Sequence, residues 1–117
     1  VEKETIYTKS DFITIHTPLN VETDNLIDLG AMTKMKNTAF LINTSRGKII
    51  NEKDLKFALK NRIIAGAALD VYEKEPPEDL ELLKLDNIIC TPHIGGNSKE
   101  AVLAMGISSI KHLVDFQ

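Results

Sequence analysis

Residues 39–47 read Ala-Phe-Leu-Ile-Asn-Thr-Ser-Arg-Gly, a short apolar run that ends abruptly in polar residues. A run that is apolar at successive positions is typical of a strand in a parallel sheet covered by helices. Three further runs share this character, and polar or ionisable residues follow each of them. They span 12–16, 63–71 and 87–90.

Helical patterns lie between and after these runs. Asn51 begins one, and Asp54 stands three residues later, which resembles a capping box with weaker partners. The apolar positions that follow fall on one face of a short helix that ends at Asn61-Arg62. They are Leu55, Ala58 and Leu59. Two other short helices are expected within 28–36 and near 79–84.

A longer helix is expected after Gly95-Gly96. Asn97 can cap it, with Glu100 at the third helical position. Its apolar residues line one side: Leu103, Ile107, Ile110 and Val114. The alternation of strands and helices predicts an α/β fold, a Rossmann-like parallel sheet with flanking helices and right-handed crossovers.

Composition narrows the class of protein. The chain has 117 residues, 43% hydrophobic and 26% charged, with a net charge of -3, which suits one globular domain. Cys90 stands alone, which excludes a disulfide scaffold and favours a reducing, cytoplasmic setting. No apolar run approaches the length of a membrane span, and the mild negative charge does not favour nucleic-acid binding. Neither a metal-ligand spacing nor a Gly-x-Gly-x-x-Gly loop occurs.

Ligands of open α/β sheets bind beyond the carboxyl ends of the strands, so the residues at those ends are the candidates for a site. Arg46 can hold a carboxylate by two parallel hydrogen bonds, and Gly47 after it allows close backbone approach. His93 follows a strand and can act as an acid or base near neutral pH. Glu75 can fix the tautomer of that imidazole, although Glu73 competes for this role. Each residue taken alone also fits an ordinary surface position.

Asp70 and the two glycines after His93 are further candidates. Asp70 ends a strand of small residues, where its carboxylate can accept a hydrogen bond from a ligand amide or cap a neighbouring turn. Gly95 and Gly96 precede a helix and can offer free N–H groups to an anion. Cys90 reads as a strand residue rather than a nucleophile.

Four segments together resemble the NAD-binding domain of the D-isomer-specific 2-hydroxyacid dehydrogenases, in the same order and spacing. The resemblance covers nearly the whole chain, and four motifs in register make it specific. The segments are 11–19 (DFITIHTPL), 35–47 (MKNTAFLINTSRG), 66–76 (GAALDVYEKEP) and 91–96 (TPHIGG).

The resemblance implies roles for particular residues. Arg46 would hold the substrate carboxylate, His93 would exchange a proton with the 2-keto oxygen, and Glu75 would pair with His93. The resemblance also implies residues that contact the cofactor. These are Thr17, Thr44, Ser45, Arg46, Asp70, His93, Gly95 and Gly96. The activity implied is hydride transfer between NAD(H) and a D-2-hydroxy or 2-keto acid.

The chain departs from the family pattern because two features are missing: the glycine-rich loop, and the acidic residue that selects NAD over NADP. Both would precede Val1, so NADP stays open. Residues 1–117 are therefore expected to be a partial dinucleotide-binding domain without the family's substrate domain. We expect the isolated chain to bind NAD weakly and to lack measurable turnover. An unpaired sheet edge and uncovered apolar faces predict association with another copy, as family enzymes are usually homodimers.

Within the family, Glu75 argues against the formate dehydrogenases, which use glutamine there. The start of the long helix, Asn97-Ser98-Lys99-Glu100-Ala101, favours the phosphoglycerate dehydrogenase branch and 3-phosphoglycerate as substrate. Glyoxylate/hydroxypyruvate reductases, D-lactate dehydrogenases and a phosphite-oxidising relative stay open. So does a non-catalytic NAD-sensing module like the family's transcriptional corepressors.

Overall fold

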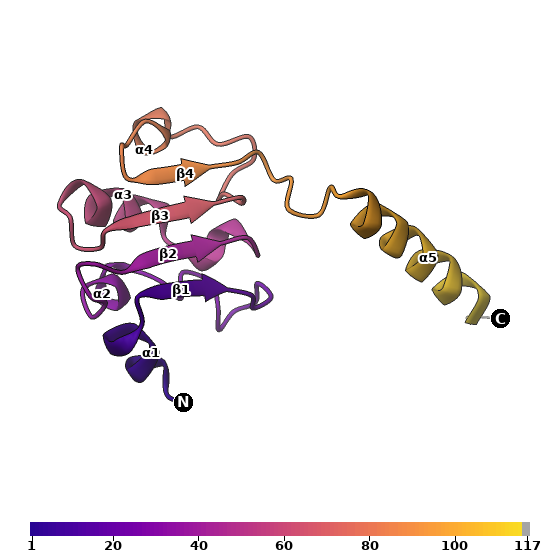
Figure 1. Cartoon of the computed structure of the whole chain (residues 1–117), viewed down its shortest axis with the longest axis horizontal. Coiled ribbons are helices and arrows are strands. Elements are labelled where there is room, and N and C mark those ends of the chain that lie inside the picture. The colour runs from indigo at the N-terminus through magenta and orange to yellow at the C-terminus, as the bar shows by residue number, and fades with distance from the viewer. Residues whose placement is uncertain (116–117) are drawn as a thin grey trace.

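Four short strands form one parallel sheet in the computed structural model, which describes residues 1–115 (Figure 1). They lie side by side in chain order, and Ile42 of the second strand stands opposite Thr14 and Ala68. All four carboxyl ends therefore meet at one edge, which confirms the predicted α/β fold. The strands are β1 (Phe12–Ile15), β2 (Phe40–Asn43), β3 (Gly66–Leu69) and β4 (Ile88–Cys90).

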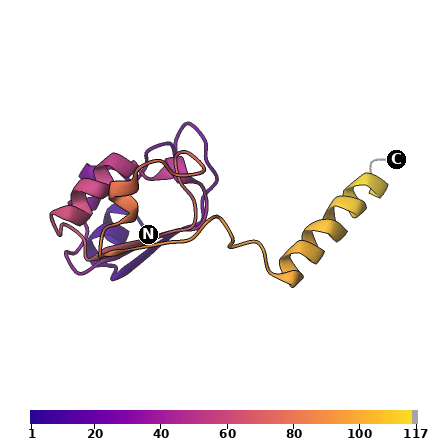
Figure 2. The ribbon, with the colours of Figure 1, turned by 90° about the horizontal axis from the view of Figure 1, so that it is seen from above.

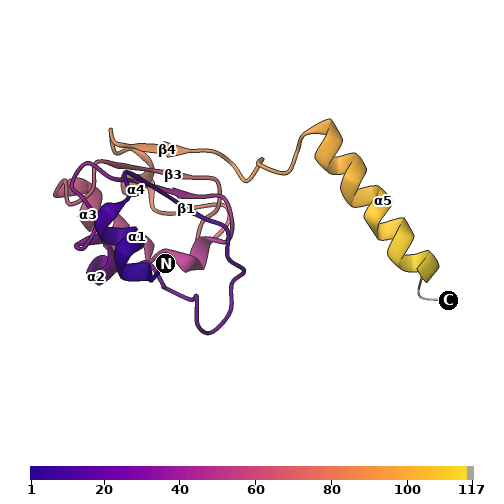
Figure 3. The same ribbon diagram turned by 60° about the horizontal axis from the view of Figure 1, so that its bottom comes forward.

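Four helices lie together on one face of this sheet (Figure 3). They are α1 (Lys3–Lys9), α2 (Leu29–Met32), α3 (Glu52–Lys60) and α4 (Leu80–Leu83), with a 3-10 turn at Gly47–Ile49. The last three match the expected helices, whereas α1 was not predicted. The core fills the space between the helices and the sheet, where Met32, Leu41 and Leu55 are completely buried.

The junction of α2 and α3 differs from the predicted capping box. Asn51 caps α3 by accepting a hydrogen bond from the Asp54 backbone N–H at 3.0 Å. The Asp54 carboxylate does not return to Asn51, because the Asn51 N–H already donates to the Ile27 carbonyl. It accepts instead from the backbone N–H of Leu29 at 2.9 Å, so one side chain joins the starts of both helices.

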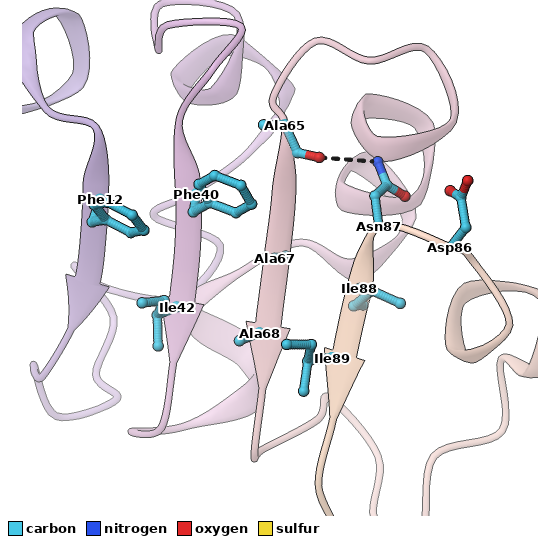
Figure 4. A pocket seen from close by; sticks show the side chains of 10 residues that line it. All are labelled: Phe12, Phe40, Ile42, Ala65, Ala67, Ala68, Asp86, Asn87, Ile88 and Ile89. Carbon is cyan, nitrogen blue, oxygen red and sulfur yellow. Dashed lines mark hydrogen bonds between the residues drawn. The ribbon is translucent and has the colours of Figure 1, made fainter.

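The opposite face of the sheet is open, which agrees with the uncovered apolar faces expected from the sequence. Within residues 1–115 no helix lies on it, as the view along the sheet shows (Figure 2). Phe12 and Phe40 stack there with ring centroids 5.4 Å apart, and Phe12 is 67% exposed. Ile89 and Ile42 continue this apolar surface around a shallow hollow (Figure 4).

The helix α5 (Lys99–Asp115) extends away from the sheet and buries none of its residues (Figure 1). Its apolar side chains are therefore exposed rather than packed. Ser98, not the predicted Asn97, caps α5, because its hydroxyl accepts from the Ala101 N–H at 3.1 Å while the Asn97 N–H is turned back to Ile94. None of the helices among the residues described is long and apolar enough to cross a membrane.

Leu41→Ala should lower the free energy of unfolding by about 2–5 kcal/mol, because Leu41 is fully buried in β2 and its truncation leaves a cavity. Urea denaturation measures this change. The matched control is Leu80→Ala, since Leu80 is 60% exposed and should cost far less. Equal losses in the two variants would contradict the location of the core.

Candidate active site

Asn43 shapes the turn after β2, at the edge where the strands end. Its side chain is completely buried, its Nδ2 donates to the Arg46 carbonyl at 2.9 Å, and its Oδ1 accepts from the Ser45 N–H at 3.0 Å. Sequence reasoning assigned Asn43 no role. An asparagine ending an apolar strand, followed by serine two residues later, is the signal of such a side-chain turn.

This turn presents Arg46 to solvent. The guanidinium is exposed, donates from Nη1 to the Ser45 carbonyl at 2.7 Å, and makes no salt bridge within residues 1–115. Gly47, the next residue, packs against the backbone of another loop: a Cβ there would lie 1.8 Å from the carbonyl oxygen of Tyr72. Glycine is therefore required at position 47. Apart from the Nη1 bond to Ser45, the guanidinium has donors left for an anionic ligand.

His93 and Glu75 form a hydrogen-bonded pair. The Nδ1–H of His93 donates to Oε2 of Glu75 at 2.7 Å, and Oε1 of Glu75 accepts from the Tyr72 N–H at 3.2 Å. The hydrogen bond from His93 lowers the pKa of the Glu75 carboxyl, which favours its ionised form. Glu73, the alternative partner considered above, bonds instead to the start of α3.

Asp70 organises the loop that carries His93. Its carboxylate is 5% exposed and accepts from the Thr91 hydroxyl at 2.6 Å and from the N–H groups of Ile94 and Gly95 at 2.9 Å each. Burial alone raises the pKa of Asp70, but these hydrogen bonds outweigh it and hold the pKa below its ordinary value. The turn cap, one of the two roles predicted for Asp70, is present in the structure.

The same contact engages one of the two glycines that were expected to offer free N–H groups. The N–H of Gly95 is not free, because it donates to Asp70. Gly96 has open space around its Cα, but α5 begins only at Lys99, so neither glycine lies in the first turn of that helix.

One hollow brings the three predicted chemical groups together. Arg46, Glu75 and His93 all line it, and Tyr72 lines it as well. An adjacent hollow is lined by Thr17, Ser45 and again Arg46. Ser45 donates its hydroxyl to the Thr17 carbonyl, which ties the ends of β1 and β2 together, and Thr44 lies exposed beside them.

Tyr72 is a second residue that sequence reasoning missed. It is buried, and its hydroxyl donates to the Thr91 carbonyl at 2.8 Å, which links the loop of Glu75 to the loop of His93. Burial raises the pKa of this phenol far above its ordinary value. A tyrosine three residues after a strand end is a weak signal, since phenol rings are common in cores.

The remaining reactive side chains lie outside this group. His16, at the end of β1, places its Nε2 2.9 Å from the Thr14 hydroxyl. His112 is exposed on α5. Burial raises the pKa of the Cys90 thiol, which disfavours the nucleophilic thiolate. In the part of the chain that the structure describes, no group of His, Cys, Asp or Glu could hold a metal ion.

Several known proteins are similar to this chain in sequence, among them two dehydrogenases or reductases of archaea. A D-3-phosphoglycerate dehydrogenase of Archaeoglobus fulgidus is 45% identical over 116 residues, which are 98% of this chain and 22% of that protein. A glyoxylate reductase of Korarchaeum cryptofilum is 43% identical over 118 residues, 100% of this chain and 36% of that protein. The chain thus spans well under half the length of these relatives.

A solved structure gives the same result. The NAD-complexed form of a D-isomer specific 2-hydroxyacid dehydrogenase from Lactobacillus delbrueckii ssp. bulgaricus matches with a TM-score of 0.83 at 30% identity, over 87% of this chain and 35% of that one. Residues 1–95 match the family model described as D-isomer specific 2-hydroxyacid dehydrogenase, NAD binding domain. The chain therefore belongs to the D-isomer-specific 2-hydroxyacid dehydrogenases, and its residues 1–95 match their NAD-binding domain.

Proposed function

We propose that residues 1–117 are the second half of the cofactor domain of an NAD-dependent dehydrogenase that interconverts a D-2-hydroxy acid and a 2-keto acid. The observation that carries this proposal is the hollow lined by Arg46, Glu75 and His93, in which the last two are hydrogen-bonded. The reaction needs at least a cationic side chain that binds the substrate carboxylate and, beside it, an imidazole that acts as acid and base.

Arg46 binds the substrate. Its unpaired guanidinium takes the carboxylate through two N–H groups and polarises the neighbouring 2-keto oxygen. The Asn43 turn limits where the guanidinium can go, since it holds the backbone on both sides of Ser45. The buried Asn43 amide therefore influences substrate orientation indirectly, by shaping the turn that carries Arg46.

His93 moves the proton. With Nδ1–H directed at Glu75, the Nε2 atom is the one left to donate a proton to the 2-keto oxygen during reduction and to accept it during oxidation. The ionised Glu75 stabilises the imidazolium and fixes the ring orientation. The backbone N–H of Tyr72 holds Glu75 in turn.

The rim beside Arg46 fits a nicotinamide cofactor. The hydroxyls of Thr17 and Thr44 make no hydrogen bond within residues 1–115 and stand exposed at this edge, and no Cβ fills the space at Gly96. These groups, with Ser45, Gly95 and Oδ2 of Asp70, would hold the cofactor, NAD or NADP. Once bound, the cofactor supplies or accepts the hydride.

Among substrates we favour 3-phosphoglycerate, because one of the similar proteins is named a D-3-phosphoglycerate dehydrogenase. A glyoxylate reductase is similar to nearly the same degree and supports glyoxylate or hydroxypyruvate as the second candidate. D-Lactate is a third. A non-catalytic NAD-sensing module with the same three residues is the alternative of a different class, and turnover separates it from the enzymes.

We also propose a cytoplasmic homodimer. Cys90 carries a free thiol, which suits a reducing compartment. The open face of the sheet exposes Phe12, Phe40 and Ile89 together, and contiguous apolar surface of this kind favours association with a second copy.

In the gene product that carries this chain, His93→Ala and Arg46→Ala should each lower kcat/KM by about 10²–10⁴, since each removes a group acting on the reacting oxygen. NADH absorbance with a panel of 2-keto acids measures this. His112→Ala and Arg62→Ala are matched controls, because both residues lie outside the hollow. An unchanged rate in His93→Ala would refute the proton-transfer role, and no turnover by the unaltered protein would favour the sensing module.

Asp70→Asn should lower the stability of the 117-residue chain at pH 7 by about 1–3 kcal/mol, because the amide cannot satisfy three donors. The folded-state pKa of Asp70 is below its ordinary value, so the stabilisation is present at neutral pH and is lost as the pH falls through that pKa. Urea denaturation between pH 7 and pH 3 should therefore show a flatter acid limb in the variant. Asp86→Asn, on an exposed side chain, should leave that limb unchanged.

Phe12→Ser with Phe40→Ser should weaken self-association, because both rings lie on the open face. Size-exclusion chromatography with light scattering over a concentration series measures the change. Phe57→Ser removes an exposed ring from α3 on the other face and should have no effect. A clean monomer of the unaltered chain at every concentration would contradict the dimer.

A further inference from the structure

Two loops that are distant in sequence touch at the site. The turn after β2 carries Arg46, and the loop after β3 carries Glu75. Their backbones meet where Gly47 lies against Tyr72, close enough that any side chain at position 47 would overlap the carbonyl group. A single contact point fixes the separation of two loops but leaves them free to rotate about it.

A second contact removes that freedom. Oε1 of Glu73 accepts from the backbone N–H of Glu52 at 2.7 Å, and Oε1 of Glu52 accepts from the backbone N–H of Glu73. Glu52 is the first residue of α3, which follows the Arg46 turn after one 3-10 turn. Each glutamate therefore holds the other's backbone, and the loop of Glu75 is joined to the start of a helix.

We propose that Glu52 and Glu73 are positioning residues: their reciprocal hydrogen bonds hold the loop after β3 so that Glu75 meets His93 and both face Arg46. This inference rests on the proposed function only for its consequence in catalysis. The geometry itself concerns Glu75 and His93, and it can be tested without turnover.

The arrangement also assigns different tasks to the two carboxylates of this loop. Glu73 is directed at α3 and engaged there, two residues before Glu75, which is directed at His93. Burial, and then the nearby charges of Glu73 and Asp79, raise the pKa of Glu52. The hydrogen bond from the Glu73 backbone N–H lowers this pKa but does not offset them. The two carboxylates repel each other. The pair persists nevertheless, because the Glu73 carboxylate accepts the backbone N–H at the start of α3 and the Glu52 carboxylate accepts a backbone N–H of the loop.

The experiment follows the Glu75 carboxyl by ¹³C NMR titration in the 117-residue chain. In the unaltered protein the hydrogen bond from His93 holds the Glu75 pKa below its ordinary value. Glu52→Ala should shift the Glu75 midpoint upward, because the loop is released and the bond to His93 weakens. Glu52→Gln keeps an acceptor oxygen for the Glu73 N–H and should retain the low midpoint.

Asp54→Ala is the control for stability alone. Asp54 lies two residues after Glu52 in α3. Its truncation removes the hydrogen bond that joins α2 to α3 and leaves the contacts of the Glu75 loop in place. It should leave the Glu75 midpoint low. If Glu52→Ala does not fold, Glu73→Ala removes the other half of the pair and should give the same upward shift.

An unchanged Glu75 midpoint in a folded Glu52→Ala or Glu73→Ala chain would overturn the proposal, as would an equal shift in Asp54→Ala. Loss of the low midpoint in Glu52→Gln would also overturn it. Failure of the dehydrogenase activity is a separate result, since it would leave these midpoints as they are.

Discussion

The site depends on the absence of a side chain at Gly47. Because the backbone of this residue lies directly against the Tyr72 carbonyl, the turn that carries Arg46 and the loop that carries Glu75 come together without an intervening layer of atoms. The other constraints build on this contact. Asn43 shapes the turn on one side, the Glu52–Glu73 pair joins the loop to α3 on the other, and the chemical groups line a common hollow.

Hydrogen-bond donors decide the charge state of each carboxylate around His93. Asp70 is the most buried, yet three donors hold its pKa low, and His93 together with the Tyr72 N–H does the same for Glu75. At the start of α3, burial and then the nearby acids Glu73 and Asp79 raise the pKa of Glu52, despite its one backbone donor. Negative charge is therefore concentrated beside the imidazole, where it can stabilise the protonated ring.

His93 itself occupies a left-handed backbone conformation, with φ of 55°. This conformation costs a residue with a side chain about 1–2 kcal/mol. The Asp70 carboxylate offsets that cost by accepting the N–H groups of the next two residues, Ile94 and Gly95. The backbone of the His93 loop is thus held by Asp70, the residue after β3, and the imidazole by Glu75, which is how a reactive group on an exposed segment becomes pre-organised.

The sequence by itself determined the parallel sheet and its edge, because the apolar runs locate the strands and the residues after them must meet where parallel strands end. It therefore placed Arg46, Asp70 and His93 at one edge, and it favoured Glu75 over Glu73 as the partner of His93. Only the tertiary structure decided that Glu73 is engaged by the start of α3, that Asp70 turns toward the His93 loop, and that Ser98 rather than Asn97 caps α5. Periodicity reports which face of an element is apolar, whereas the path of a loop and the direction of its side chains depend on contacts between segments far apart in the chain.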